Sequence, residues 1–280
     1  MRFSKWQGLG NDFVMLDCRQ QLLNNPAAWS IKLCDRHFGI GADGLALVES
    51  SDVADVRMRL INNDGSEAEM CGNLIRCVAR YAYEQGIVDR TSLTVETLAG
   101  IMRPEIILED GKVARVKVDM GRPRLKKGEI PVLGEPDASA RSIAIALPDG
   151  QTFVGTAVST GNPHVVIFVD NIAAIDLNVI GPQIEKHELF PKKINVEFAQ
   201  VLAPDAVRMR VWERGAGITL ACGTGSCATV VAGILTGRLS RAATVKLDGG
   251  DLRVEWPSDD ASMFMTGPAT EVFRGEWIND

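Results

Sequence analysis

Two stretches of the chain alternate apolar and polar residues in nearly the same order. They run from Val56 to Ile61 and from Val207 to Trp212. Because the side chains of a strand point alternately to opposite faces, each stretch predicts a β-strand with one buried face. Two short runs of apolar, β-prone residues, 13–16 and 165–169, predict further strands.

Helical spacing appears after each of two Cys-Gly pairs. Residues 228–235 are apolar almost all round, which predicts a buried helix that ends at Gly237. In the first half of the chain, apolar residues recur at helical intervals ahead of Gly86, which is placed to cap the helix. These residues are Leu74, Ile75, Val78, Ala79 and Ala82.

The chain repeats itself once, without gaps, at an offset of 151 residues. Gly10-Asn11 falls on Gly161-Asn162, and Cys71-Gly72 falls on Cys222-Gly223. The two alternating strands obey the same offset. The five residues from Val56 to Leu60 match those from Val207 to Val211, with only the last residue differing. Together with two dipeptides at the same offset, this match indicates two related halves.

Many short strands around one good helix in each half predict an α+β protein. We expect two pseudo-symmetric domains, each a curved sheet wrapped on a central helix. The stretch from Arg122 to Gly150 is rich in Pro, Gly and charged residues. We therefore expect it to be a surface connection that leads into the second half.

The composition is that of a globular protein, with 46% apolar and 24% charged residues among 280. A formal charge of −6, without a basic tail, argues against a nucleic-acid partner. No apolar run approaches the roughly 18 residues of a membrane span. Residues 1–8 contain no apolar signal-peptide core, so we expect a cytoplasmic protein without a membrane partner.

Six cysteines are too few for a disulfide scaffold, and we expect them to be reduced. There is no C-x-x-C pair and histidine is scarce, so we expect no metal site. Two of the cysteines, Cys71 and Cys222, recur at the same place in both halves. The other four are expected to be small buried apolar residues, and they are Cys18, Cys34, Cys77 and Cys227.

Cys71 and Cys222 each stand immediately before a predicted helix. The unpaired N–H groups and the positive dipole end there favour anions and lower the pKa of a thiol from its reference of about 8.5. Two such thiols on either side of a cleft suit the inversion of a stereocentre. A thiolate removes a proton from one face of a carbon, and a thiol returns one to the other face.

The N–H groups that follow the two cysteines are candidates for holding a carboxylate. They belong to Gly72-Asn73 and Gly223-Thr224. The α-carbon of an amino acid is a very weak acid, so its carbanion needs electrostatic stabilisation. Helix N-termini aimed at the α-carboxylate in a site that excludes water would supply it.

Two other interpretations of these motifs involve different chemistry. Residues 223–228 with Asp248, and residues 39–44, each imitate a dinucleotide fingerprint. However, only 32 residues follow Asp248, and a strand-like run follows the second match, so we expect no nicotinamide or flavin. A non-catalytic binding protein, or a switch that closes a reversible disulfide between Cys71 and Cys222, would also present two thiols.

The motifs around these residues resemble the diaminopimelate epimerase family. In chain order they are Gly8 to Phe13, Asn62 to Glu67, Cys71-Gly72-Asn73, Gly161 to His164, Glu213-Arg214-Gly215 and Ala221 to Gly225, and the resemblance extends to Gly267-Pro268-Ala269. It implies an isomerase without a cofactor or metal, whose partner is a small-molecule amino-acid substrate. That family interconverts LL- and meso-diaminopimelate for lysine and peptidoglycan synthesis, as a homodimer.

The resemblance also implies roles for individual residues. Cys71 and Cys222 would be the acid–base pair, with Glu213 and His164 as further catalytic residues that tune proton affinity. The implied substrate-binding residues are Asn11, Asn62, Gly72, Asn73, Asn162, Asn195, Glu213, Arg214, Gly223 and Thr224.

The resemblance extends to the fold. Each half would be a mostly antiparallel sheet or barrel around its helix. The halves would span 1–120 and 121–267, a C-terminal strand within 268–280 would return to the first half, and the active site would lie in the cleft between them.

Three positions depart from the family pattern. Gly44 stands where some members have Gln, so that a side-chain contact is lost. Leu74 replaces a small residue beside the thiol and is expected to narrow the pocket. Phe273 replaces a Tyr at the dimer contact. A related two-cysteine racemase that acts on another amino acid, such as proline, is therefore the alternative.

Overall fold

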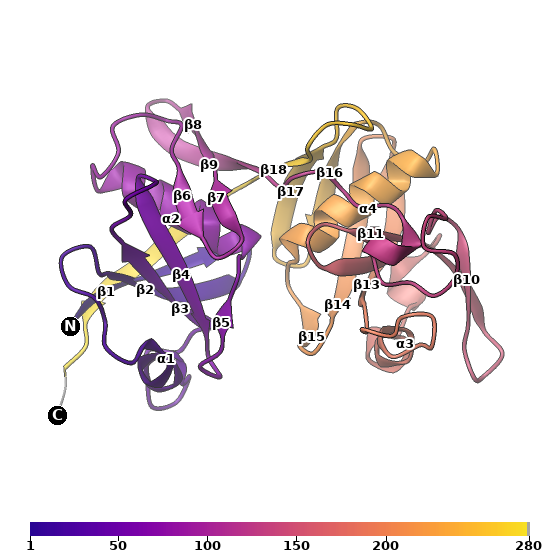
Figure 1. Cartoon of the computed structure of the whole chain (residues 1–280), viewed down its shortest axis with the longest axis horizontal. Coiled ribbons are helices and arrows are strands. Elements are labelled where there is room, and N and C mark those ends of the chain that lie inside the picture. The colour runs from indigo at the N-terminus through magenta and orange to yellow at the C-terminus, as the bar shows by residue number, and fades with distance from the viewer. Residues whose placement is uncertain (279–280) are drawn as a thin grey trace. The chain divides into compact units, whose positions relative to one another are not determined.

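The computed structural model describes residues 1–278, and the chain divides into two compact units (Figure 1). Unit 1 comprises Met1–Asp119 together with the chain from Thr266 onward, and unit 2 comprises Met120–Met265. Within the described residues, no helix has the length and apolar character needed to cross a membrane.

Unit 1 contains an eight-stranded sheet in the order β19-β1-β2-β3-β4-β6-β7, with β5 paired to β4. It also contains two helices and the hairpin of β8 and β9. The bounds are β1 (Arg2–Gly8), β2 (Asn11–Asp17), α1 (Pro26–Cys34), β3 (Gly44–Glu49), β4 (Val56–Asn62), β5 (Glu67–Ala68), α2 (Gly72–Glu84), β6 (Val95–Thr97), β7 (Gly100–Met102), β8 (Glu105–Glu109), β9 (Lys112–Asp119) and β19 (Thr270–Glu276).

Unit 2 contains a sheet in which β10-β11-β12-β13-β14-β16-β17 follow one another, with β15 paired to β14. The bounds are η1 (Lys127–Glu129), β10 (Ile143–Ala146), β11 (Thr152–Ser159), β12 (Pro163–Phe168), η2 (Ile172–Ala174), α3 (Leu177–Glu185), β13 (Asn195–Ala203), β14 (Ala206–Glu213), β15 (Gly217–Thr219), α4 (Gly223–Leu235), β16 (Ala242–Leu247) and β17 (Gly250–Glu255). The boundary between the units falls within β18 (Phe264–Gly267).

The two units share one architecture down to the strand register. In the parallel pair of β2 and β3, Phe13 lies opposite Gly44, and in β12 and β13, His164 lies opposite Asn195. Both pairs obey the sequence offset of 151 residues. The α+β class and the two pseudo-symmetric halves are therefore confirmed. The strand order of each sheet is open, so the barrel alternative does not hold.

Helices cover both faces of the unit 1 sheet. Val14 of β2 packs with Leu33 of α1 in one cluster. On the other face, Trp6 of β1 pairs with Phe13, and its ring meets Tyr81 of α2 edge-on at 6.2 Å between centroids. Successive β2 residues thus alternate between the two helices, as the strand period requires.

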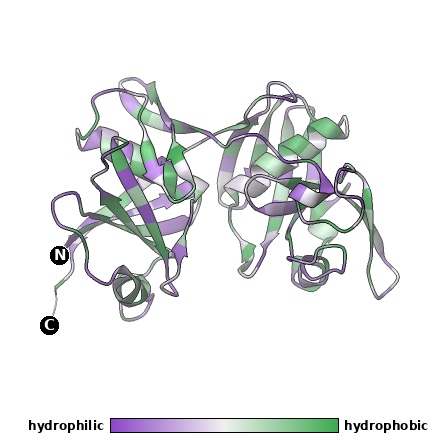
Figure 2. Cartoon of the chain, in the orientation of Figure 1, coloured by the Kyte–Doolittle hydropathy of each residue, from purple (hydrophilic) through white to green (hydrophobic). Residues whose placement is uncertain are grey.

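The predicted helices after the Cys-Gly pairs are confirmed as α2 and α4. Ten of the thirteen residues of α4 are buried, and Figure 2 colours most of this helix as hydrophobic. Gly86 and Gly237 follow the two helices with φ of +65° and +69°. Glycine takes this left-handed conformation without a Cβ penalty, which explains its place at both helix ends.

The expectation for the stretch from Arg122 to Gly150 was wrong. This stretch contains η1 and β10, and it contributes to the hydrophobic core of unit 2. Its core residues fall in short groups, and the Pro, Gly and charged residues between these groups concealed the pattern. The residues that enter the core are Ile130, Val132, Ala140, Ile145 and Leu147.

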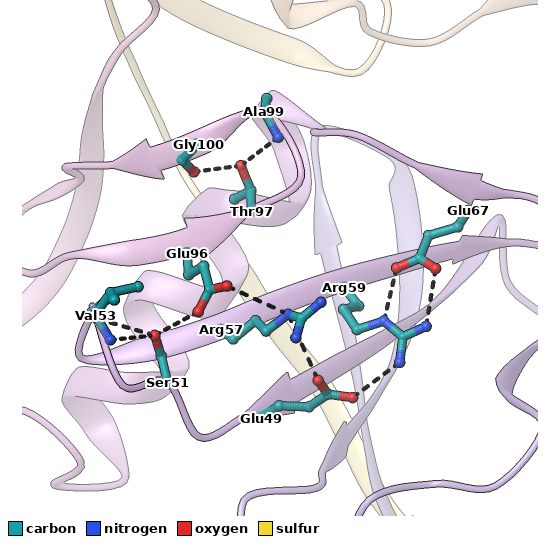
Figure 3. Close-up of polar contacts among 11 residues, drawn as sticks. Glu49, Ser51, Val53, Arg57, Arg59, Glu67, Glu96, Thr97, Ala99 and Gly100 are labelled. Atoms are coloured by element: carbon teal, nitrogen blue, oxygen red, sulfur yellow. Dashed lines mark hydrogen bonds and ion pairs between the residues drawn. The ribbon is translucent and has the colours of Figure 1, made fainter.

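Arg57 and Arg59 form a network of ion pairs on the polar face of β4 (Figure 3). Arg59 lies 2.7 Å from Glu67 and 3.3 Å from Glu49, whose side chain is almost fully buried. Arg57 lies 3.9 Å from both Glu49 and Glu96. The alternation predicted for this strand is confirmed, since Arg57 and Arg59 alternate with buried apolar residues.

Candidate active site

Cys71 occupies the N-cap of α2, where its carbonyl accepts from the backbone N–H of Ile75 at 3.0 Å. It has extended backbone angles, φ −139° and ψ 120°, and its side chain makes no capping hydrogen bond. Instead its thiol donates to Oδ1 of Asn11 across 3.6 Å. The side-chain amide of Asn73 donates to the same oxygen at 3.3 Å. The structure thus brings three predicted site residues of unit 1 together.

The turn between β1 and β2 places Asn11. Leu9 and Gly10 both have positive φ, 56° and 86°, so the chain reverses sharply before Asn11 starts β2. The side-chain amide of Asn11 donates to Asp43 at 2.8 Å. This bond turns Oδ1 of Asn11 toward Cys71 and leaves the amide nitrogen engaged elsewhere.

Arg76 supports the same helix N-terminus, and the sequence interpretation missed it. Its side chain is fully buried. It donates to the carbonyl of Gly72 at 2.8 Å, to Oδ1 of Asn73 at 3.1 Å and to the carbonyl of Pro268 at 3.0 Å. The available signal was a charged residue inside the apolar run of α2, because a buried charge needs polar partners.

Cys222 caps α4 in the same place but with different contacts. Its sulfur accepts from the backbone N–H of Gly225 at 3.4 Å and lies 3.4 Å from the hydroxyl of Thr224. Burial raises the pKa of this thiol well above its ordinary value, and the charges of Glu213 and Glu197 raise it further, so the lowered pKa expected at this helix N-terminus is wrong for Cys222. The two hydrogen bonds lower it only in part.

Asn162 does not bond to the second thiol. Its Oδ1 lies 2.9 Å from Nε2 of His164 and accepts from Thr160 at 3.3 Å. The other ring nitrogen of His164 lies 2.6 Å from Oε1 of Glu197. Neither His164 nor Glu197 exposes any side-chain surface. The two halves therefore place an equivalent Asn differently relative to their thiols.

Glu197 is the second residue that the sequence interpretation missed. It occupies the middle of β13, whose residues Asn195 to Ala199 are all buried. Burial raises the pKa of this carboxyl group, although His164 lowers it in part. The signal was a single carboxylate inside an otherwise apolar strand, a pattern typical of a functional or tightly paired group.

Asn195 and Arg214 lie together at one end of the unit 2 sheet. Oδ1 of Asn195 accepts from the backbone N–H of Arg214 at 2.8 Å, and its amide donates to the Pro163 carbonyl at 2.7 Å. The guanidinium of Arg214 donates to the carbonyl of Lys192 at 3.0 Å. Since that bond uses one nitrogen, the rest of the guanidinium fork keeps donors for a carboxylate.

Other predicted residues have separate partners. The carboxylate of Glu213 accepts from the hydroxyl of Thr219. The side-chain amide of Asn62, at the end of β4, donates to the hydroxyl of Ser66 at 2.9 Å. Phe273 lies on β19, where its ring meets Phe3 edge-on at 5.9 Å.

Two of the departures from the family pattern have structural explanations. A Cβ at position 44 would lie 2.8 Å from the side chain of Leu60 and 3.0 Å from the carbonyl of Ile61, so the backbone here suits glycine. Leu74 is fully buried, and it therefore fills the interior of unit 1 beneath the start of α2.

Comparison with known proteins identifies relatives over the whole chain. The sequence matches the family described as diaminopimelate epimerase over residues 3–126 and 156–272. It is 54% identical to the diaminopimelate epimerase of Pelotomaculum thermopropionicum and 52% identical to that of Methanococcus maripaludis, with 99% of each chain covered. The fold matches a probable proline racemase from Agrobacterium radiobacter with a TM-score of 0.71 at 15% identity, covering all of this chain and 93% of that one.

Proposed function

The chain belongs to the diaminopimelate epimerase family, and from this premise we propose that it converts LL-diaminopimelate into the meso isomer with two cysteines as acid and base. The observation that carries the two-thiol assignment is the repeated half-site. In both units a cysteine stands at the N-cap of a thirteen-residue helix, and an Asn lies sixty residues before it.

Two thiols suit this reaction because inversion needs proton transfer on opposite faces of one carbon. The thiolate of one cysteine takes the α-proton and becomes a thiol. The thiol of the other gives its proton to the opposite face and becomes a thiolate. In the reverse direction the two groups exchange roles. General acid–base groups of this kind contribute about 10²–10⁴-fold to a rate.

The helix N-termini would stabilise the carbanion. We assign the α-carboxylate to the N–H groups of Gly72 and Asn73 on α2 and of Gly223 and Thr224 on α4. An anion at such a place meets unpaired N–H donors and the positive end of the helix dipole. Negative charge that develops as the α-proton leaves is stabilised by the same donors.

Polar side chains would hold the other amino-acid end of the substrate. Side-chain carbonyls accept from an ammonium group, and a guanidinium pairs with a carboxylate through two parallel bonds. The bond from Arg214 to Asn195 supports a common role, because it fixes the backbone at the base of the guanidinium. The residues assigned to the substrate are Asn11, Asn62, Asn162, Asn195, Glu213 and Arg214.

His164 and Glu213 are assigned to the tuning of the thiols. The charge of Glu213 raises the pKa of Cys222, which favours the protonated form of that thiol. His164 reaches Asn162 and Glu197 at once and so links the second half-site to a buried carboxylate.

Conversion without any added cofactor tests the proposal. Purified protein under reductant is incubated with LL-diaminopimelate, and the isomers are separated by chiral chromatography. We expect the meso isomer to accumulate to equilibrium. If only proline or another amino acid racemises, the related two-cysteine racemase is the better assignment. If none does, and the fold and thiols are intact, the enzyme assignment fails.

We also propose that the protein is a cytoplasmic homodimer. Val272 and Phe273 expose 55% and 47% of their surface on β19, an edge strand of the unit 1 sheet. Large apolar side chains on an exposed edge strand favour association with a second chain. Light scattering should give the mass of two chains, and Phe273→Asp should reduce it toward one.

A further inference from the structure

The surroundings of the two thiols differ at three equivalent positions. Each pair obeys the offset of 151 residues, and the residues opposite one another in the strands agree with it. Unit 1 has three buried apolar side chains at these positions. Unit 2 has a histidine, a glutamate and a glycine there. The pairs are Phe13 and His164, Ala46 and Glu197, and Leu74 and Gly225.

The carboxylate of Glu197 lies against the first turn of α4. A Cβ on Gly225 would stand 2.7 Å from Oε1 of Glu197 and 3.3 Å from the sulfur of Cys222. The carboxylate and the thiol thus face the same point of the helix. In unit 1, Leu74 occupies the equivalent helix position, and Ala46 occupies the strand position equivalent to Glu197. Glycine at 225 is what gives Glu197 its space.

His164 holds Glu197 in the interior of unit 2. Nε2 of His164 lies 2.9 Å from Oδ1 of Asn162, and Nδ1 lies 2.6 Å from Oε1 of Glu197. The other oxygen, Oε2, is buried and accepts no hydrogen bond in the described residues. An orphaned carboxylate oxygen in the interior costs stability, and groups that carry this cost are found at functional sites.

Resting on the proposed function, we propose that Glu197 is a positioning residue that makes the second thiol different from the first. Held by His164 and given space by Gly225, its carboxylate presents negative charge to Cys222 and keeps that thiol protonated in the resting protein. Cys222 then serves as the proton donor in the first turnover. On donation its S–H bond breaks, the carbanion's electron pair forms the new C–H bond, and Cys222 becomes the thiolate.

The groups around Cys222 agree with this assignment. The carboxylates that act on the thiol are Glu213 from β14 and Glu197 from β13, and both disfavour the thiolate. On α4 itself, Thr224 and the N–H of Gly225 favour the thiolate. His164 on β12 bonds to Glu197 and so determines where that carboxylate points. Removing Glu197 therefore shifts the balance toward the thiolate.

Alkylation of Cys222 tests the proposal without substrate. Only the thiolate reacts with iodoacetamide, so the labelling rate against pH, measured by mass spectrometry, reports the ionisation of this cysteine. In Glu197→Gln we expect the midpoint to move to lower pH by about 1 unit, which is about a tenfold faster labelling near pH 8. The alkaline limb of kcat/KM should move in the same direction.

Glu185→Gln is the matched control. Glu185, on α3 of unit 2, is also buried, but its carboxylate accepts from the indole N–H of Trp212 at 2.7 Å. We expect its labelling profile to equal that of the wild type. Unchanged midpoints in both variants would overturn the proposal, and so would a general loss of activity in Glu197→Gln without a shift. If the wild-type protein shows no epimerase activity, the proposed function itself is contradicted.

A second variant keeps the test decisive if Glu197→Gln does not fold. Unit 1 already packs Phe, Ala and Leu at the equivalent positions, so it supplies a template that fits this backbone. The triple variant His164→Phe, Glu197→Ala, Gly225→Leu copies that template. We expect the same downward shift in the labelling of Cys222. A profile like that of the wild type would refute the role of Glu197.

Discussion

The thiol of Cys71 donates to the side-chain oxygen of Asn11, sixty residues away, over 3.6 Å. The equivalent bond is missing in unit 2, where the same oxygen of Asn162 lies 2.9 Å from His164. Cys222 instead accepts from the backbone of Gly225. The repeat thus preserves the backbone of the two half-sites while the bonds of their sulfurs differ.

Serine in place of either N-cap cysteine should nearly abolish turnover. A hydroxyl ionises far less readily than a thiol, so Cys71→Ser and Cys222→Ser each lose one of the two proton-transfer groups. We expect kcat to fall by at least about 10²-fold in each variant. Cys18→Ser, a buried cysteine of unit 1, is the control and should retain its kcat. Near-normal turnover in either N-cap variant would be incompatible with two-thiol catalysis.

Loss of Arg76 should destabilise unit 1. Arg76→Ala removes the side-chain donor of the Pro268 carbonyl and of Oδ1 of Asn73, and each buried polar group left unsatisfied costs about 1–3 kcal/mol. We expect urea denaturation to show a free energy of unfolding lower by about 3 kcal/mol or more. Arg19→Ala, which removes an ion pair to Asp17 near the surface, should change it by about 1 kcal/mol or less. Equal effects of the two substitutions would contradict the support assigned to Arg76.

Arg214 should discriminate substrates by their second carboxylate. Arg214→Ala removes the fork that we assign to the distal carboxylate, so diaminopimelate should bind at least about tenfold more weakly. A monocarboxylate analogue should lose little affinity, because it lacks the partner group. Calorimetric titration measures both affinities, with Arg253→Ala, an exposed arginine of unit 2, as the control. Equal losses for both ligands would exclude this role.

Ionised Asp12 should stabilise the folded protein, and this stabilisation should be lost at low pH. Burial by itself raises the pKa of this carboxyl group, but hydrogen bonds from Arg36 and Lys5 outweigh burial and lower the pKa to about 2. A lowered pKa in the folded state stabilises the protein above the unfolded value of 3.8, and this stabilisation disappears as the pH falls toward 2.

The Asp12→Asn variant therefore should lose stability mainly above pH 4. Because Asp12 is partly open to solvent, we expect a difference of about 1–2 kcal/mol near neutral pH that closes between about pH 4 and pH 2. Thermal melts across this range measure it. Asp137→Asn removes an exposed pair with Lys126 and should show no such pH-dependent gap. A gap for Asp12→Asn that persists unchanged to pH 2 would contradict the assignment.

Much of the fold was predictable because the repeat reinforces each local signal. The alternation from Val56 and the helical spacing before Gly86 each recur in the second half, and both predictions are confirmed by β4 and α2 with their counterparts. The stretch from Arg122 failed for the opposite reason. It has no counterpart in the repeat, and residues such as Ile145 enter the core from a segment dense in turn-forming residues.

The candidate site, like the fold, could be predicted from the sequence only in part. The repeat singles out Cys71, Cys222 and their Asn partners, because both halves present them at the same spacing. Glu197 and Arg76 escape this signal, since Ala46 and Cys227 stand at the equivalent positions. Their importance follows from burial and hydrogen bonding, which depend on the packing of distant segments. Sequence periodicity does not determine that packing.

The two-thiol mechanism is tested most directly by finding which isomer first gains deuterium from the solvent. LL-Diaminopimelate is incubated with the protein in deuterated water, and proton NMR and mass spectrometry follow both isomers at early times. One thiol removes the α-proton and the other delivers a solvent deuteron, so the new meso isomer should carry deuterium while the remaining LL isomer keeps its proton. Deuterium entering the LL isomer as fast as the meso isomer would indicate a single base and contradict the account.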